Sequence, residues 1–366
     1  MHQPPPALSI PPGTGTTVTV SAIDSTLSII GCPSEYMWSP AIKGFPRVTC
    51  GCWSILIQHP SGRNLLYDLG TRKDWENLPP ACGLKKYMAD GILKQVKVER
   101  DVGDMMREAG IVVEGVIWSH FHWDHTGNMS KFPKETKLIV GEGFKGAFMP
   151  GFPVNPKAHT LESDFEGRKV EELDFGSDGL KIGNFKAIDY FGDGSFYLLD
   201  TPGHALGHVN ALARTVDDEF IHLCGDSAHH CGEIRPSRYI PLPDEIDPSP
   251  LKSGLGVCPG GLFHKMLKNG SKEDHLIEFI DLGAGTYEDQ KYALIYDEPA
   301  LRETVKKVEG FDANENVLTV LAHDWTLKGV IDEWPKNLNG WRRKGWRKEA
   351  FWKFLGDFEE AAMEDE

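Results

Sequence analysis

The sequence has no hydrophobic run long enough to cross a membrane and no excess of basic residues. A membrane-spanning helix needs roughly 18 or more consecutive apolar residues, and no such run occurs among the 366 residues. Residues 1–6 also lack the basic region and apolar core of a secretion signal. Lysine and arginine total 39 against 54 aspartate and glutamate residues, a net charge of -15, which opposes binding to nucleic acid or anionic lipid. We therefore expect a cytoplasmic protein that binds neither and acts on a small neutral molecule.

Regularly spaced cysteines are also lacking: the seven cysteines are odd in number and scattered along the chain. Their spacing matches neither a zinc ribbon nor the dense disulfide framework of a small secreted protein, which favours a reducing compartment. Cys50 and Cys52 could face one way on a strand as a pair of metal ligands. A pair of small buried thiols is the interpretation that we favour.

What the sequence does have is a concentration of metal-ligand side chains at residues 119–126. The apolar residues just before them predict a buried strand that ends at Ser119. On an extended backbone, residues two apart point the same way, so His120 and His122 can bind one ion from the same side. The chain is then expected to turn into a helix, so that the next two ligands, Asp124 and His125, face a second position beside the first.

Three further ligand-type residues occur downstream, each directly after an apolar, strand-like run. They are His204, Asp226 and His323, after predicted strands at 195–200, 220–224 and 317–321. Imidazole and carboxylate groups are suited to Zn²⁺, and a site with two metals can share one water-derived ligand. The sequence therefore predicts ligands that project from strand ends along one edge of the fold.

The remaining pattern predicts helices packed outside two central sheets. A hairpin is expected from the apolar runs 53–58 and 64–68, because the His-Pro-Ser-Gly sequence between them is typical of a turn. Helical spacing of apolar residues, together with turn residues nearby, predicts four helices: 98–109, 262–267, 274–280 and 299–308.

Three regions can be distinguished along the chain. Residues 1–16, rich in proline and glycine, are expected to form a flexible lead-in, and residues 17–330 to form one large domain. Within that domain, the stretch 232–290 is typical of an insertion near an active site, where we expect an apolar wall formed by Tyr239, Ile240, Leu255 and Phe263.

Residues 331–366 interleave tryptophans with basic side chains and end in an acidic tail. Such a segment could bind nucleic acid or a membrane. We favour the other interpretation, a terminal helix that packs its tryptophans on the domain and keeps its charges in water.

The ligand pattern resembles that of the metallo-β-lactamase superfamily. Five recurrent motifs of the superfamily occur in order, beginning with Asp68-Leu69-Gly70, over about residues 17–330. The resemblance implies an α+β fold, an αββα sandwich of two mixed β-sheets flanked by helices, with metals at the edge between the sheets. It also implies a ligand set, with one metal held by His120, His122 and His204, a second held by Asp124, His125 and His323, and Asp226 bridging both. The expected cofactor is two Zn²⁺ ions per chain, although other divalent metals would also suit these ligands.

Within the superfamily, residues 119–128 and 201–208 look like the corresponding segments of N-acyl homoserine lactonases, which open lactone rings with two metals. Those enzymes have a tyrosine three residues beyond the bridging aspartate, where this chain has His229, followed by His230. His229 could donate a hydrogen bond to the substrate carbonyl as the tyrosine does, or it could face solvent. Flavodiiron oxidases carry glutamate in place of His122, and the best-known β-lactamases use a cysteine at the second metal, so those branches fit less well.

These residues predict a metal-dependent hydrolase that opens a small cyclic ester or cyclic amide, which is a lactone or a lactam. In the expected mechanism a metal-bound hydroxide attacks the carbonyl, His229 helps to stabilise the oxyanion, and Asp124 relays a proton to the leaving atom. Three alternatives stay open: a thioesterase of the glyoxalase II kind, a single-iron sulfur dioxygenase, and a binding protein that keeps the fold without turnover. The sequence does not define the oligomeric state, and a homodimer is compatible with it.

Overall fold

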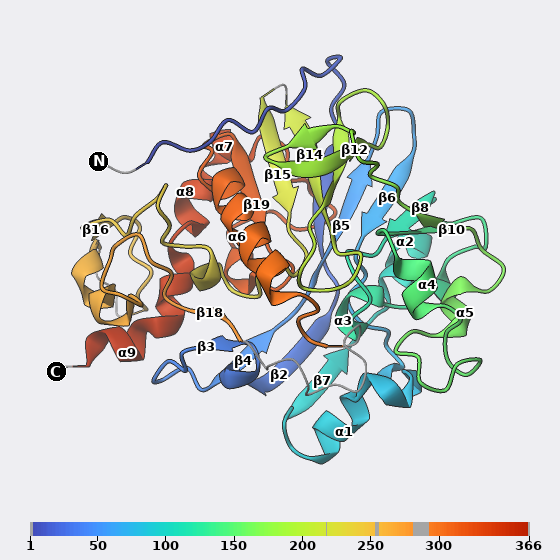
Figure 1. The fold of residues 1–366 in the computed structure, drawn as a ribbon, viewed down its shortest axis with the longest axis horizontal. Helices are drawn as coiled ribbons and strands as arrows, with labels where there is room; N and C mark the ends of the chain where they lie inside the picture. Colours follow the sequence, from blue (N-terminus) through green and yellow to red (C-terminus); the bar gives the residue numbers. More distant parts are fainter. Residues whose placement is uncertain (1–2, 217, 253–255, 281–292, 365–366) are drawn as a thin grey trace.

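Two six-stranded sheets face each other in the middle of the molecule, and helices cover their outer faces (Figure 1). The computed structural model describes residues 3–216, 218–252, 256–280 and 293–364. The arrangement is an αββα sandwich of mixed sheets, so the fold implied by the family resemblance is confirmed. None of the helices in the described part of the chain combines the length and hydrophobicity that a bilayer-spanning helix needs.

The first sheet has the strand order β1-β5-β6-β8-β9-β10. Its strands are β1 (Thr19–Asp24), β5 (Trp53–Gln58), β6 (Asn64–Tyr67), β8 (Gly115–Ile117), β9 (Lys137–Val140) and β10 (Val170–Glu172). The first three strands are antiparallel and the last four run parallel, with β6 belonging to both groups. The predicted hairpin is confirmed as β5 and β6, and its turn is closed by a hydrogen bond of 2.9 Å from the Gly62 amide to the His59 carbonyl.

The second sheet has the order β11-β12-β13-β14-β15-β19. Its strands are β11 (Lys181–Ile182), β12 (Phe185–Asp189), β13 (Phe196–Asp200), β14 (Val209–Val216), β15 (Glu219–Leu223) and β19 (Val317–Val320). All neighbours are antiparallel except β15 and β19, which are parallel. Three of these strands, β13, β15 and β19, are the ones predicted to precede His204, Asp226 and His323.

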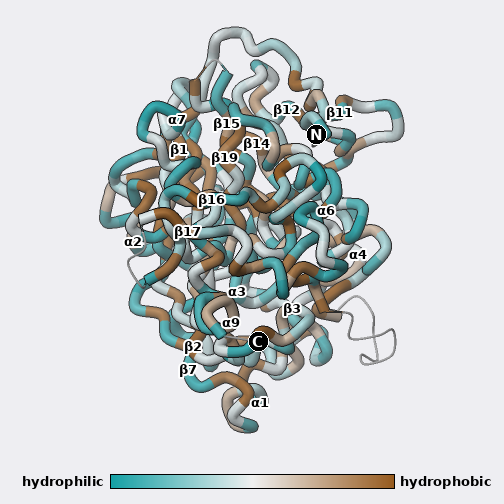
Figure 2. The backbone as a smooth tube through the Cα atoms, turned by 90° about the vertical axis from the view of Figure 1, so that its left-hand side faces the viewer, coloured by the Kyte–Doolittle hydropathy of each residue, from teal (hydrophilic) through white to brown (hydrophobic). Residues whose placement is uncertain are grey.

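The hydrophobic core lies between the two sheets and continues under the outer helices. Along β5, Ile55 and Ile57 belong to the cluster between the sheets, whereas Leu56 packs under the helices that cover the first sheet. Successive strand residues face opposite sides of a sheet, so a strand buried on both faces needs a nearly continuous apolar run. Figure 2 shows the hydrophobic stretches of the chain gathered in the interior.

Helices cover both outer faces of the sandwich. The first sheet is covered by α2 (Val102–Glu108), α4 (Phe144–Phe148) and α5 (Glu162–Phe165), and the second by α6 (Glu298–Asp312). The predicted helix at 299–308 is confirmed as α6, which begins where the Asp297 side chain accepts a hydrogen bond of 3.0 Å from the Ala300 amide. The helix predicted at 98–109 starts later, as α2, because Val98 is the last residue of a strand, β7 (Gln95–Val98).

A small third sheet lies at the lower edge of the sandwich in Figure 1, near α3 (Trp123–Thr126). It contains β4 (Arg47–Cys50), β2 (Leu27–Pro33) and β7, in that order. Helix α1 (Leu84–Ala89) lies between β6 and β7 in the sequence. Apolar side chains of this sheet, such as Ile29 and Val48, line the cavity at the functional site.

Two predicted regions can be compared with the structure. Residues 3–16, expected to be a flexible lead-in, lie extended against the second sheet: Leu8 is buried, and its carbonyl accepts a hydrogen bond of 2.7 Å from the Gly183 amide. The described part of 232–290 contains 3-10 helices η5 (Cys231–Glu233) and η6 (Gly260–Met266) and short strands β16 (Glu245–Ile246), β17 (Cys258–Pro259) and β18 (Glu278–Phe279).

The helix predicted at 262–267 is therefore a 3-10 helix, and the one predicted at 274–280 is wrong. The amides of Leu276 and Ile277 both donate to the Gly232 carbonyl, and β18 then pairs with β3 (Trp38–Ser39). These contacts join residues more than 40 positions apart, which is why local spacing did not indicate them.

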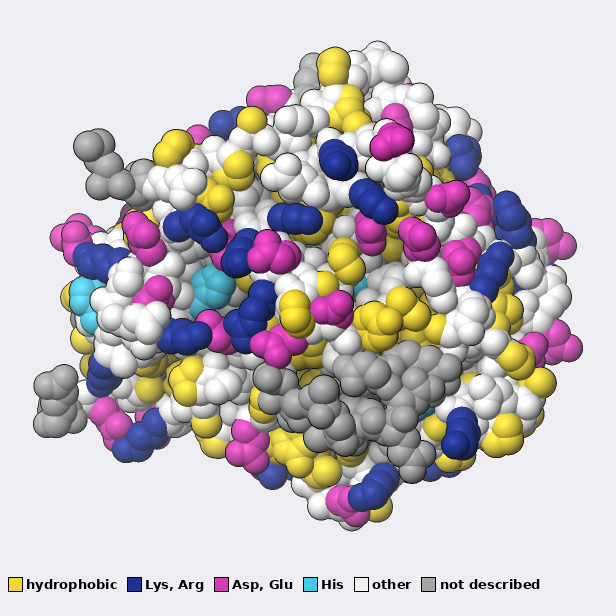
Figure 3. Space-filling view, in the orientation of Figure 1, with side chains coloured by type: hydrophobic (Ala, Val, Ile, Leu, Met, Phe, Trp, Pro, Cys, Tyr) yellow, Lys and Arg dark blue, Asp and Glu magenta, His cyan; other side chains and the backbone are white. Residues whose placement is uncertain are grey.

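The carboxy-terminal segment forms several short helices in place of the single helix predicted. They are α7 (Trp341–Lys344), α8 (Trp346–Ala350), the 3-10 helix η9 (Lys353–Phe358) and α9 (Glu359–Met363). Gly345, whose φ is +76°, separates α7 from α8. Trp341 and Trp346 are buried in the core between the sheets, while on the face drawn in Figure 3 the Lys and Arg side chains are interspersed with Asp and Glu.

Candidate metal centre

The seven predicted ligands meet at one edge of the sandwich, where the strands that carry them end. His120 and His122 follow β8, and α3 then turns Asp124 and His125 back toward the same edge. The three ligands from the second sheet follow β13, β15 and β19. Together they form two groups of candidate metal ligands: His120, His122, His204 and Asp226 in one, and Asp124, His125 and His323 in the other.

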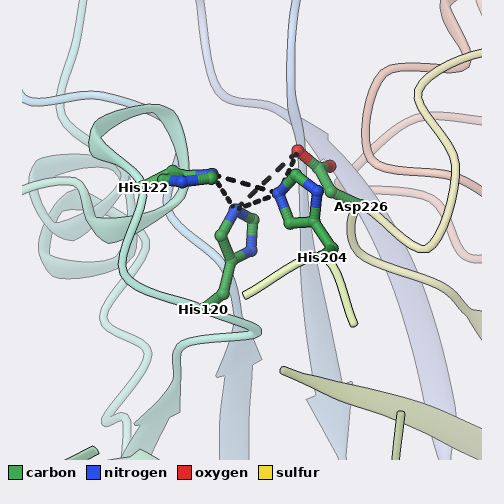
Figure 4. Close-up of side chains that lie close together, drawn as sticks. All are labelled: His120, His122, His204 and Asp226. Carbon is green, nitrogen blue, oxygen red and sulfur yellow. Dashed lines mark hydrogen bonds and ion pairs between the residues drawn. The ribbon is translucent and has the colours of Figure 1, made fainter. Parts of the chain in front are cut away.

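In the first group, three imidazole nitrogens converge on one point (Figure 4). The Nε2 atom of His120 lies 2.9 Å from Nδ1 of His122 and 3.2 Å from Nε2 of His204, and the last two atoms are 3.0 Å apart. The Oδ2 atom of Asp226 completes the group at 3.8 Å from the His120 nitrogen and 3.6 Å from the His204 nitrogen.

The second group lies on the other side of Asp226. The Oδ2 atom of Asp226 is 3.2 Å from Nε2 of His125, and its Oδ1 atom is 3.4 Å from Nε2 of His323. Asp124 approaches both of these histidines, at 4.0 Å from the His125 nitrogen and 3.6 Å from the His323 nitrogen. Asp226 thus contacts members of both groups.

The first group fits a metal ion. Zinc bonded to nitrogen at 2.0–2.1 Å in a tetrahedron places its ligand atoms about 3.3 Å apart, close to the observed separations. Burial lowers the pKa of His122 to about 4 and holds the pKa values of His120 and His204 well below the ordinary range. The three imidazoles are therefore neutral and present lone pairs, which is the form that binds metals.

The second group carries protons that a metal would replace. Burial alone would lower the pKa of His125 and of His323, but the Asp226 carboxylate raises both well above the ordinary value. Burial would conversely raise the pKa of Asp226, yet these two histidines hold it well below its usual range. Among the described residues, Oδ1 of Asp226 has no hydrogen-bond partner. A divalent cation here would satisfy that oxygen and displace the imidazolium protons.

Buried groups behind the ligands fix how two of the histidines point. The Oδ2 atom of Asp68 lies 2.8 Å from Nδ1 of His125, and the same carboxylate accepts hydrogen bonds of 2.7 Å from both the amide and the hydroxyl of Ser119. The Nδ1 atom of His323 lies 2.8 Å from the Gly51 carbonyl oxygen. In each case the outer nitrogen is engaged, so Nε2 is free to face the metal position.

His208 has a role that sequence reasoning did not assign. Its Nε2 atom accepts a hydrogen bond of 3.0 Å from the backbone amide of Asp226, and its Nδ1 atom lies 2.9 Å from the Thr201 hydroxyl. Burial lowers the pKa of His208 to about 3, so the ring is neutral and can accept that bond. The only signal in the sequence was its place in the segment 201–208, which also contains the candidate ligand His204.

His229 faces the metal centre and is not a solvent-facing residue. Its Nε2 atom is 3.3 Å from Oδ2 of Asp226, and only 7% of its surface is exposed. Its backbone amide and that of His230 donate to one oxygen of buried Glu233, at 2.5 and 2.9 Å. His230 itself points away, into a group of aromatic rings, with Nε2 at 3.3 Å from Oδ2 of Asp357.

An apolar cavity of about 320 Å³ opens beside the ligands. Its polar end is formed by His122, Asp124, Asp226, His229 and His323. Its walls are mainly apolar and aromatic, and they come from the third sheet, the segment around α1 and the residues next to the ligands: Ile29, Val48, Tyr87, Leu93, Phe121 and Trp123. The described lining contains no lysine or arginine.

The predicted apolar wall is therefore wrong for the residues that can be placed. Phe263 is buried in the core and Ile240 lines a different surface depression, while Tyr239 does not reach the cavity. Leu255 lies outside the described residues. The stretch after Asp226 packs its apolar side chains, such as Ile234, Leu242 and Leu267, into the core cluster that includes α6, so they are not available to the site.

The structure agrees with the interpretation of Cys50 and Cys52 as a pair of buried thiols. All seven are free. Cys52 is fully buried with its sulfur 3.9 Å from Nδ1 of His125, and Cys50 is buried and lines the cavity. Neither belongs to the two groups of candidate ligands.

Comparisons with known proteins agree with this geometry. The model of the metallo-beta-lactamase superfamily matches residues 47–284. A gamma-lactamase of Fusarium pseudograminearum is 40% identical over 368 residues, which cover 97% of this chain and 85% of the relative. A metallo-hydrolase of Annulohypoxylon moriforme is 39% identical over 370 residues, covering 97% of this chain and 91% of the relative.

A solved structure shares the fold at low sequence identity. An N-acyl homoserine lactone hydrolase with the product N-hexanoyl-L-homoserine bound at its catalytic metal centre superposes with a TM-score of 0.53. The match covers 88% of this chain and 99% of the other, at 13% identity.

Proposed function

Because the chain belongs to the metallo-β-lactamase superfamily, we propose that it is a dinuclear zinc hydrolase that opens a small, neutral lactone or lactam ring. The observation that carries the proposal is the pair of ligand groups joined by Asp226 at the polar end of an apolar cavity. The gamma-lactamase and lactone hydrolase named above support a cyclic ester or amide as the substrate class.

The chain would hold the two ions with all seven ligands. His120, His122 and His204 would bind one, Asp124, His125 and His323 the other, and Asp226 both. When bound, two such ions supply a water that ionises near neutral pH and an electrophile for the carbonyl oxygen.

Asp124 and His229 are the residues that would handle charge and protons during ring opening. Both line the cavity next to the ligands. Burial would lower the pKa of His229, but the Asp226 carboxylate, 3.3 Å from its Nε2 atom, raises the pKa above the ordinary value and favours a proton on that nitrogen. That N–H can donate to the oxygen on which negative charge develops.

Asp124 would move a proton to the leaving atom. Its carboxylate is 14% exposed at the polar end of the cavity, so it can reach both the ligands and a bound ring. An amine is a poorer leaving group than an alcohol unless it is protonated. Loss of the Asp124 proton transfer should therefore slow lactam opening more than lactone opening.

The cavity favours a neutral, flat ring as substrate. Trp123, Phe121 and Tyr87 offer aromatic surface. The described residues that line the cavity include no lysine or arginine that would attract an anionic thioester such as a glutathione conjugate. This observation favours ring opening over the glyoxalase II alternative.

The direct experiment is a hydrolysis panel of a γ-lactone, a γ-lactam and a thioester. We expect ring opening by the wild type and its loss in His122→Ala, because that imidazole is one of three nitrogens around one ion position. The matched control is His264→Ala, which removes an exposed histidine of η6 and should leave the rate unchanged. Hydrolysis of thioesters alone, or oxygen consumption without hydrolysis, would contradict the proposal.

A second experiment tests His229. We expect His229→Ala to lower kcat by about a hundredfold to a thousandfold, the usual cost of removing one oxyanion donor. His229→Gln keeps an N–H and should recover part of the loss. Equal activity of both variants and the wild type would remove His229 from the mechanism.

A further inference from the structure

Glu233 is a buried carboxylate outside the two groups of candidate ligands, and it has no part in the ring-opening steps proposed above. It is the last residue of η5, and only 1% of its surface is exposed. Its Oε2 atom accepts hydrogen bonds from the backbone amides of His229 and His230, at 2.5 and 2.9 Å. One carboxylate oxygen therefore holds two consecutive peptide groups shortly after Asp226.

Only one of these two bonds belongs to the cap of η5. The Nδ1 atom of His230 accepts a hydrogen bond of 3.0 Å from the Gly232 amide while Glu233 accepts one from the His230 amide, and together these bonds form a capping box. Such reciprocal bonds satisfy the free amides at the start of a helix. The shorter bond, from the His229 amide, lies outside this pattern. It fixes the backbone at His229 itself.

This backbone sends two neighbouring histidines in opposite directions. His230 is extended, with φ −142° and ψ 143°. Successive side chains on extended backbone point to opposite sides. His229 accordingly approaches Asp226, whereas the His230 ring lies 5.0 Å from the Trp38 ring, centroid to centroid. A rotation of the peptide groups that Glu233 holds would turn His229 away from Asp226.

The His229 ring has less support of its own than two other histidines of the centre. The outer nitrogens of His125 and His323 each lie 2.8 Å from an oxygen that fixes the ring. Among the described residues, Nδ1 of His229 has no hydrogen-bond partner. The direction of this imidazole therefore depends on its backbone, and the bond to Glu233 holds that backbone in place.

We propose that Glu233 is a positioning residue for ring opening: by holding the His229 backbone, it aims the His229 imidazole at the polar end of the apolar cavity. The inference rests on the proposed function, in which the His229 N–H donates to the developing oxyanion. Glu233 is not among the described residues that line the apolar cavity, so it acts through His229 and not on the substrate.

Three substitutions separate the reach of the side chain from its charge. Glu233→Gln keeps an oxygen at the same reach and loses the charge, whereas Glu233→Asp keeps the charge on a shorter side chain. Glu233→Met fills a similar volume and has neither. The matched control is Glu309→Met, which removes a buried glutamate of α6 whose partners are Arg238 and His275.

The first measurement is the rate of opening of a neutral lactone. We expect Glu233→Met and Glu233→Asp to lower kcat by about tenfold to a hundredfold, since a displacement of roughly 1 Å can cost about a hundredfold. KM should stay unchanged, because the His229 N–H acts in the transition state. Glu233→Gln and Glu309→Met should keep the wild-type kcat. Wild-type activity in Glu233→Met, or an equal loss in Glu233→Gln, would overturn the proposal.

A double variant tests whether the loss passes through His229. In the His229→Ala background, Glu233→Met should lower kcat no further, because the imidazole that Glu233 positions is absent. A loss as large as in the wild-type background would show that Glu233 supports the fold in general, and it would contradict the proposal.

Crystal structures of the wild type and the variants give a readout that needs no activity. The distance from Nε2 of His229 to Oδ2 of Asp226 should stay near 3.3 Å in Glu233→Gln and increase by on the order of 1 Å in Glu233→Met. If Glu233→Met does not fold, Glu233→Asp takes its place. If the wild type opens no lactone or lactam, the proposed function fails, and these distances still decide whether Glu233 positions His229. An unmoved imidazole would overturn the inference.

Discussion

Asp68 is the single residue on which the orientation of His125 most depends. Its carboxylate lies against Nδ1 of His125 and accepts two hydrogen bonds from Ser119, at the point where β8 ends. Partners of this kind, one step behind a metal ligand, fix the ring and raise its basicity.

We predict that Asp68→Asn weakens metal binding at the second position by roughly tenfold to a hundredfold. The amide has a similar shape but loses the charge and one acceptor. A competition titration against a chelator measures the affinity, and Asp332→Asn, which removes an exposed carboxylate paired with Lys336, is the control. Equal metal affinities of the wild type and Asp68→Asn would show that Asp68 only holds the turn after β8 and does not support His125.

A second buried carboxylate, Asp164 of α5, links stability to pH. Burial raises the pKa of Asp164 to about 7, above its ordinary value of 3.8. Between these two pH values the folded chain keeps a proton that the unfolded chain has lost, so the free energy of unfolding is highest below the lower value and falls as pH rises toward 7.

We predict that Asp164→Asn reduces this pH dependence. From pH 5 to pH 8 the wild type should lose about 2–3 kcal/mol more of its free energy of unfolding than the variant, which cannot ionise there. Urea denaturation at both pH values gives the comparison. Parallel losses in the two proteins would mean that Asp164 is ionised in the folded state throughout.

At the residue level, the sequence was sufficient to predict which candidate ligands come together, but not which residues surround them. His204, Asp226 and His323 could be found because each directly follows an apolar run, a local pattern. The contact of His208 with the Asp226 amide spans 18 residues and depends on how β13 and β15 are placed in the sheet, so no local pattern indicates it.

At the level of elements, strands and helices with long apolar periodicity were predictable, and short elements held by distant contacts were not. The hairpin β5–β6 and the helix α6 follow from their own residues. Strand β18 forms because it pairs with β3, and the apolar wall of the site comes from β2, β4 and the residues near α1, about 200 residues away from the stretch where it was expected.

Hydrogen bonds around the buried ion pair of Arg235 and Asp312 attach the carboxy-terminal segment to the rest of the domain. The guanidinium of Arg235 donates to both oxygens of Asp312 at 2.8 and 2.6 Å and to the carbonyl oxygen of Phe351 at 2.8 Å. Arg347 donates to the backbone carbonyl of Asp312 as well. These bonds join the loop after η5, the end of α6 and the end of α8.

We predict that Arg235→Met lowers the free energy of unfolding by about 3–5 kcal/mol, because Asp312 is then buried without a partner. The double variant Arg235→Met/Asp312→Leu should lose less than the single one. Denaturant midpoints of the wild type, the two single variants and the double variant measure the effect. The control is Lys336→Ala, which breaks an exposed ion pair and should cost under about 1 kcal/mol. Additive losses in the cycle would contradict coupling of the two side chains.

At the scale of the whole molecule, the sandwich places its candidate metal ligands at one edge, beside an apolar cavity. The strand ends of both sheets bring the seven candidate ligands to that edge, and the third sheet supplies an apolar wall of the cavity. The account depends throughout on metal ions at that edge.

The measurement that tests this most directly is the metal content per chain of protein purified without added metal, with His122→Ala measured beside it. The account predicts two zinc ions per chain in the wild type and a loss of zinc in His122→Ala. One iron ion per chain, or no bound metal in the wild type, would contradict it.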